Sequence, residues 1–144
     1  MTQSFKLPPQ LSIPEQSDPQ ALIEKLSDRV IQAVSPTMEK RLEGFSKATK
    51  RRIALRSSEK EQTSFEWLME SLNAITMGYI DYRTGLNTCN DLIGRSLNSE
   101  GMGVLLTSLS KALGERTTAE IYRELTTQAD AVISKEFGIA IEKS

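Results

Sequence analysis

Hydrophobic residues recur every three or four positions through most of this chain, which is the spacing of one face of an α-helix. No stretch alternates apolar and polar residues as a half-buried strand does, and no Asn-Gly or Asp-Gly pair marks a β-hairpin. The pattern therefore predicts an all-α protein. Its clearest stripe follows Pro19 and consists of Leu22, Ile23, Leu26, Val30 and Ala33.

Two proline-containing pairs predict where the first helices begin. Asp18 before Pro19 is a typical helix start, because aspartate accepts a bond from a free amide and proline has no amide to leave unpaired. Ser35 before Pro36 repeats this signal. We therefore expect one helix to end at Ser35 and a second to begin at Pro36.

Capping boxes and glycines predict the remaining helix ends. Ser58 with Glu61, and Thr117 with Glu120, have the spacing at which each side chain bonds the other residue's free amide. Gly85 is a plausible left-handed residue at a helix end, Gly114 is expected to stop the helix before it, and the last helix is expected to end near Phe137 and Gly138. The result is a single bundle of five to six helices over residues 19–144. The expected helices span 19–35, 36–56, 58–83, 87–97, 99–113 and 117–137.

The first eighteen residues are predicted to form an extended arm, residues 1–18, ahead of the bundle. They contain Pro8, Pro9 and Pro14, and proline both lacks an amide donor and restrains the residue before it. Apolar residues recur through this arm, so we expect it to attach to the body of the protein or to a neighbouring subunit. The candidate interface residues in the arm are Phe5, Leu7, Leu11 and Ile13.

The sequence offers little for catalysis. It contains no histidine, which is the commonest general base and metal ligand, and its only cysteine is Cys89. Gly101 and Gly103 form a lone pair without the lysine that follows in a nucleotide-binding loop. Cys89 is better interpreted as a small packed residue than as a reactive thiol. We expect a protein that is not an enzyme and that has no metal, cofactor or small-molecule substrate.

Cysteine usage and hydropathy predict a cytoplasmic protein. A single cysteine forms no intrachain disulfide, and residues 1–10 have no charged start leading into an apolar stretch. The longest apolar runs are only a few residues, so no membrane span is expected.

Charge is distributed unevenly along the chain, although the formal net charge is only −1. Residues 36–56 carry seven basic side chains and two acidic ones, a net charge of +5, whereas residues 57–144 carry a net charge of −5. On a helix over 36–56 the apolar residues fall on one arc, and most of the basic residues lie opposite or beside it. The candidate binding residues are Lys40, Arg41, Lys47, Lys50, Arg51, Arg52 and Arg56.

This basic helix has several interpretations. It could bind nucleic-acid phosphates, because Lys40 and Arg51 are about 16 Å apart along one helix and phosphates recur about every 3.4 Å along a strand. It could instead meet an acidic protein surface, or be a solvated face. A membrane-surface helix is the weakest interpretation, because the apolar face lacks the bulky residues that insertion requires.

In size and charge distribution the chain is similar to small helical-bundle subunits of nucleoprotein assemblies, including RNA-guided effector complexes. That similarity implies a non-catalytic, sequence-independent subunit that contacts the backbone of RNA or DNA and neighbouring protein subunits. The alternative is a protein–protein adaptor or self-associating scaffold whose basic helix meets an acidic partner. The nucleic-acid hypothesis depends on one unbroken helix over 36–56; a break near Gly44, or neutralisation by the chain's own carboxylates, removes its basis.

Two further features bear on partners. Trp67 lies on the opposite side of its helix from Phe65, so the helix is either buried on two sides or Trp67 anchors an interface. The segment 88–113 has the layout of a helix-turn-helix, but its second helix offers only Lys111, far from the N-terminal end that reads bases. Sequence-specific DNA recognition is therefore not expected.

Overall fold

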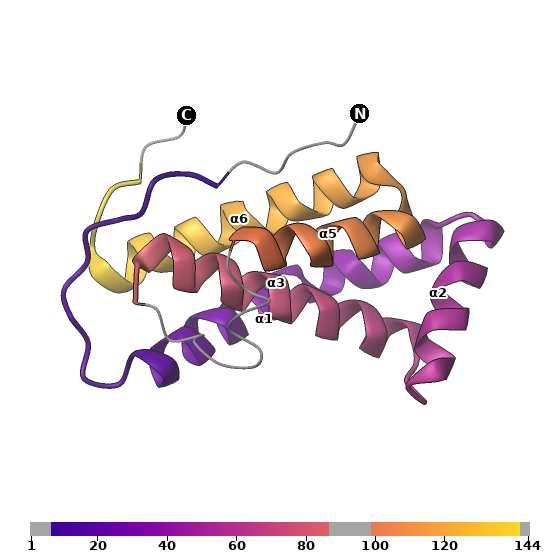
Figure 1. The fold of residues 1–144 in the computed structure, drawn as a ribbon, viewed down its shortest axis with the longest axis horizontal. Coiled ribbons are helices and arrows are strands. Elements are labelled where there is room, and N and C mark those ends of the chain that lie inside the picture. The colour runs from indigo at the N-terminus through magenta and orange to yellow at the C-terminus, as the bar shows by residue number, and fades with distance from the viewer. Residues whose placement is uncertain (1–6, 87–98, 142–144) are drawn as a thin grey trace.

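The computed structural model describes residues 7–86 and 99–141, with side chains from residue 103 onward in the second range. The described residues contain helices and no strand, so the all-α prediction is confirmed (Figure 1). The helix expected over 87–97, and Cys89 within it, lie outside the described residues. The helices are α1 (Pro19–Gly44), α2 (Lys47–Glu59), α3 (Ser64–Thr84), α5 (Ser99–Leu113) and α6 (Glu115–Phe137).

Helix α1 begins as predicted but does not end at Ser35. The Asp18 side chain accepts a hydrogen bond from the Ala21 amide, with Pro19 in the first turn. Pro36 lies inside the helix, where it costs about 3 kcal/mol. The apolar stripe continues across it, because Val34 and Met38 are both buried. Burial of two such side chains is worth about 1.5–3 kcal/mol each, which offsets the cost of the proline.

The chain breaks instead between α1 and α2. Phe45 adopts an extended backbone after Gly44, and Ser46 caps α2 by accepting a bond from the Thr49 amide at 3.2 Å. The prediction of one continuous helix over 36–56 is therefore wrong. A glycine followed two residues later by a good capping residue gave the chain a place to turn.

The expected capping box at the start of the third helix is also misplaced. Helix α2 continues past Ser58, and Glu61 has a positive φ of 54° in the connecting turn. The actual box is Thr63 with Glu66: the Thr63 side chain accepts from the Glu66 amide at 3.0 Å, and the Glu66 carboxylate accepts from the Thr63 amide at 2.9 Å. The hydrogen bonds that the Thr63 backbone and side chain make to the Glu66 carboxylate lower the pKa of Glu66 by favouring its charged form.

Glycines end three helices, as the sequence predicts. Gly85 and Gly138 adopt the left-handed conformation at the ends of α3 and α6. Gly114, with a φ of 92°, forms the turn between α5 and α6. The capping box expected at Thr117 is wrong, because α6 already begins at Glu115 with no side-chain cap.

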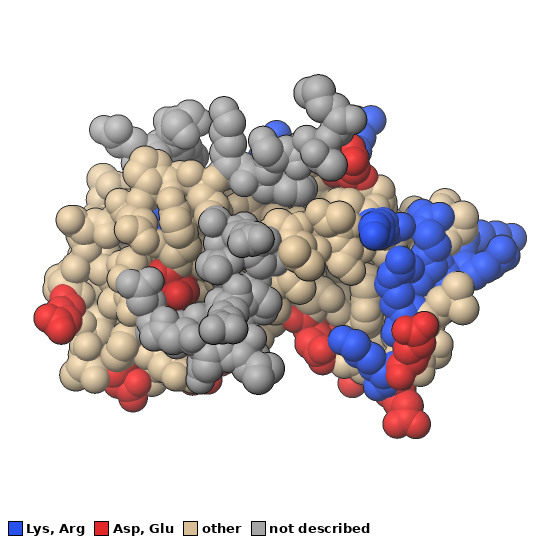
Figure 2. Space-filling view, in the orientation of Figure 1, with Lys and Arg blue, Asp and Glu red and all other residues tan. Residues whose placement is uncertain are grey.

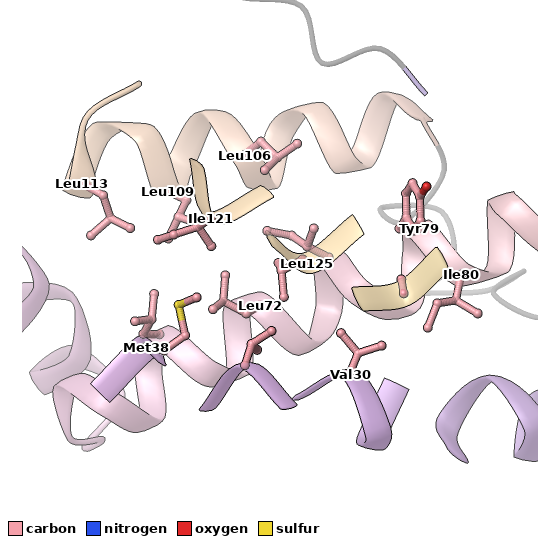
Figure 3. Close-up of a cluster of buried hydrophobic side chains, with 14 of the residues drawn as sticks. Val30, Met38, Leu72, Tyr79, Ile80, Leu106, Leu109, Leu113, Ile121 and Leu125 are labelled. Atoms are coloured by element: carbon pink, nitrogen blue, oxygen red, sulfur yellow. The ribbon is translucent and has the colours of Figure 1, made fainter. Parts of the chain in front are cut away.

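The core lies where α1, α3, α5 and α6 pack side by side (Figure 1). Figure 3 shows how all four helices contribute to it: Val30 and Met38 from α1, Leu72, Tyr79 and Ile80 from α3, Leu106, Leu109 and Leu113 from α5, and Ile121 and Leu125 from α6. None of the helices in the described ranges is both long enough and apolar enough to cross a membrane.

The described part of the N-terminal segment, residues 7–18, contains no helix. The Leu11 amide donates to the Arg83 carbonyl at 2.7 Å, and the Arg83 guanidinium donates to the Pro9 carbonyl. Leu7 and Leu11 pack against the core. This segment is thus bound to the end of α3.

Candidate binding surface

Helix α2 lies at one end of the molecule and crosses the direction of the longer helices (Figure 1). It packs against α3 and α5. Its buried residues are Thr49, Ile53 and Ser57, which recur at a spacing of four, and Ile53 is the one large apolar side chain among them. The opposite side of α2 points away from the bundle.

The break after Gly44 separates the predicted basic residues. Lys40 and Arg41 belong to α1, and the other five belong to α2. The Arg41 guanidinium lies 3.5 Å from the Glu120 carboxylate and 3.3 Å from the Glu124 carboxylate, both on α6. Arg41 is therefore neutralised within the chain, and the predicted unbroken basic face is absent.

Two arginines of α2 are used to attach the helix. The Arg52 Nε donates to the Ala112 carbonyl at 2.9 Å, and its Nη2 donates to Thr49 Oγ1 at 3.0 Å. Ala112 lies in the last turn of α5, where carbonyls lack helical partners and a cation is favoured. Arg56 donates to the Arg52 carbonyl at 3.2 Å. Arg52 and Arg56 are only partly exposed.

The remaining predicted cations are available to a partner. Lys47, Lys50 and Arg51 on α2 are exposed, as is Lys40 on α1. None of these four forms an ion pair with another residue of the described ranges. The space-filling view shows lysine and arginine side chains gathered at the end of the molecule where α2 lies (Figure 2).

Sequence analysis missed two residues of this surface. Leu55 is 62% exposed on the outward side of α2, and it is one of two large apolar side chains that are exposed in the described residues. Lys111 is exposed beside Ala112, whose carbonyl binds Arg52, so it adds a cation from α5. The helical spacing of Leu55 from Ile53 could have shown that it lies off the buried stripe.

Three of the five expected protein-interface residues pack within this chain. Leu7 and Leu11 pack against the core, and Trp67 is buried within it at 7% exposure. The interpretation of a helix buried on two sides therefore accounts for Trp67. Ile13 is half-buried, and Phe5 lies outside the described residues.

A polar cluster lies near the end of α3, away from α2. The Tyr79 hydroxyl donates to the Asp130 carboxylate at 2.9 Å, and Arg83 Nε donates to the same oxygen at 3.2 Å. Tyr122 packs edge-on against Tyr79 with 6.4 Å between ring centroids. Burial, and secondarily the charge of Asp130, raises the pKa of Tyr79 well above its usual value and that of Tyr122 to about 12.

This cluster is a structural one. Arg83 also binds the Pro9 carbonyl, so the cluster joins α3, α6 and the N-terminal segment. Tyrosine is already protonated near neutral pH, and the raised pKa values of Tyr79 and Tyr122 extend that protonated, hydrogen-bonding form to more alkaline pH. In residues 7–86 and 99–141, no three histidine, cysteine, aspartate or glutamate side chains are grouped to hold a metal ion.

Comparison with known proteins gives no assignment for this surface. The chain matches no known protein family. No curated protein and no solved structure is significantly similar to it.

Proposed function

We propose that this protein is a non-catalytic adaptor or self-associating scaffold that binds an acidic protein surface through α2. The observation that carries this proposal is Leu55, which is 62% exposed on the outward side of α2, four residues after Arg51 and eight after Lys47. An exposed leucine costs hydration free energy unless a partner covers it. Cations on one side of an apolar residue match a protein partner with acidic residues on one side of an apolar patch.

Nucleic-acid binding is the second candidate. It is favoured by the four exposed cations Lys40, Lys47, Lys50 and Arg51 and by the absence of any acid from residue 44 to residue 58. It is weakened by the break after Gly44 and by the internal pairing of Arg41. Together these remove the continuous row of cations that contact with successive phosphates of a strand requires. Phosphate contacts also make no use of Leu55. As part of a nucleoprotein assembly, the protein would have to bind through a compact patch.

Leu55→Ser distinguishes the two candidates. We suggest titrating the purified protein into three fluorescent probes: a 20-residue amphipathic peptide of glutamate and leucine, a mixed-sequence single strand, and the duplex of that strand. The adaptor proposal predicts that the peptide binds most tightly and that Leu55→Ser weakens it about tenfold, the effect of roughly 1.4 kcal/mol of lost apolar contact.

Charge variants complete this test. Lys47→Ala/Arg51→Ala weakens peptide binding in the adaptor proposal, while Lys25→Ala/Arg29→Ala, on α1 and paired with Glu136, is the matched control with two cations removed elsewhere. Oligonucleotide binding that exceeds peptide binding, falls steeply with salt and ignores Leu55→Ser would support the nucleic-acid candidate and overturn the adaptor proposal.

A further inference from the structure

The outward side of α2 carries four exposed residues at an exact spacing of four: Lys47, Arg51, Leu55 and Glu59. Residues at this spacing form one ridge along a helix. Lys47, Arg51 and Glu59 form no ion pair with any residue of the described ranges. The ridge therefore changes from positive to apolar to negative along its length, and its charges have no ion-pair partner among residues 7–86 and 103–141.

The ridge of one copy is complementary in charge to the ridge of a second copy that runs in the opposite direction. When two copies of α2 lie antiparallel with Leu55 opposite Leu55, the residue four before Leu55 faces the residue four after it on the other copy. These residues are Arg51 and Glu59, which have opposite charges. A two-fold axis repeats each contact, so one arrangement forms two ion pairs around an apolar centre.

We propose that a second copy of this chain binds here, with two α2 helices packed antiparallel across a two-fold axis beside Leu55. This inference rests on the proposed function, because it names the partner of the same surface. Arg51 of each copy pairs with Glu59 of the other, and the two leucines cover each other. Ala48, Ala54 and Ser58 beside the ridge are small, which allows the two helices to approach closely.

The position of α2 leaves room for this pairing. The helix lies across one end of the molecule, and its buried side faces α3 and α5 (Figure 1). A second copy on the outward side therefore extends the molecule end to end, with the two bundles on opposite sides of the paired helices. A helix of 13 residues is about 20 Å long, so the interface is smaller than that of a standard stable complex. We expect a weak dimer, with a Kd in the micromolar range or above.

Charge exchange tests the pairing directly. Arg51→Glu places two glutamates opposite each other on both sides of the axis, and Glu59→Arg places two arginines there. Each single variant should associate at least about tenfold more weakly than the wild type in sedimentation equilibrium, since like charges face each other. An equal mixture of the two variants re-forms both ion pairs as a heterodimer, and should recover wild-type association. A mixture that stays monomeric overturns the proposal.

Disulfide cross-linking tests the direction of the pairing. In a Cys89→Ser background, Leu55→Cys brings two thiols together at the axis, and oxygen with copper phenanthroline should join them into a covalent dimer. Ala48→Cys is the matched control, because antiparallel helices hold those two positions about 21 Å apart along the axis. Equal cross-linking at both positions indicates a parallel pairing, and no cross-linking at residue 55 indicates no pairing; either result overturns the proposal.

The outcome also separates this inference from the proposed function. A wild-type protein that remains monomeric up to about 1 mM, yet binds the glutamate–leucine peptide in a Leu55-dependent way, would overturn self-pairing and leave the adaptor proposal standing. A protein that neither associates nor binds that peptide contradicts both. Circular dichroism of the variants confirms folding, which these exposed positions should preserve.

Discussion

Two arginines toward opposite ends of this molecule, Arg83 and Arg51, are placed in opposite ways. Near the end of α3, Arg83 is 5% exposed and donates hydrogen bonds to the Asp130 carboxylate and the Pro9 carbonyl, so its charge is paired within the chain. On α2, Arg51 is exposed and pairs with no residue of the described ranges. Arg83 stabilises the fold, whereas Arg51, unlike its neighbour Arg52, is exposed where a partner can contact it.

The largest expected effect comes from breaking the internal pair. Asp130→Ala leaves Arg83 buried without its carboxylate and removes the acceptor of Tyr79, so the free energy of unfolding should fall by about 3 kcal/mol. Arg51→Ala is the control and should change it by less than about 0.5 kcal/mol. Urea denaturation measures both, and equal losses would show that the contrast between the two arginines is false.

Attachment of α2 to the bundle depends on one apolar side chain. Ile53→Ala should lower the free energy of unfolding by about 2 kcal/mol, because Ile53 is fully buried and is the large apolar anchor of that helix. Leu55→Ala, two residues away and exposed, should cost less than about 0.5 kcal/mol in the monomer. Hydrogen exchange should show that the amides of α2 lose protection before those of the other helices in the Ile53 variant. An equal loss of protection in all helices would contradict this.

Adjacent arginines of α2 should respond differently. Arg52→Ala removes the bonds to Ala112 and Thr49, so the free energy of unfolding should fall by about 1 kcal/mol. Arg51→Ala should leave stability unchanged and weaken peptide binding instead. If Arg52→Ala costs no stability and weakens binding as much as Arg51→Ala, then Arg52 belongs to the binding surface after all.

The effect that is smallest near neutral pH is alkaline destabilisation, because it sets in only above about pH 9. Tyrosine ionises near pH 10 in the unfolded chain, whereas burial raises the pKa of Tyr122 to about 12 and that of Tyr79 further. The unfolded state therefore releases protons first, and the free energy of unfolding should fall as the pH rises from about 10 to about 12. Urea denaturation at pH 9 and 11 measures the loss, and Tyr122→Phe should reduce it. An unchanged loss in that variant would contradict the assignment.

The sequence predicted the helices more accurately than their boundaries. Asp18, Gly85 and Gly138 act as expected, because each satisfies a local requirement of the helix end that it occupies. Pro36 was misjudged, because its local cost is outweighed by burial of Val34 and Met38 against distant helices. Local sequence patterns do not show this burial, because it depends on contacts with residues far away along the chain.

The sequence predicts which residues of the candidate site are basic, but not which of them are exposed in the folded chain. The concentration of cations on residues 36–56 is a property of the sequence, and five of the seven lie on α2 at one end of the molecule. Which cations remain free depends on contacts with α5 and α6: Arg52 binds Ala112, and Arg41 binds Glu124. Such pairs lie 60 and 83 residues apart, beyond the reach of periodicity and capping rules.

Amide chemical-shift mapping tests the central claim, that the outward side of α2 is a protein-binding surface. Unlabelled glutamate–leucine peptide is titrated into isotope-labelled protein, and the shift of every assigned amide is followed. We predict that the largest changes cluster at Lys47, Arg51, Leu55 and Glu59, with little change near Arg83. Changes centred elsewhere in the bundle, or none at a tenfold excess of peptide, would contradict the claim.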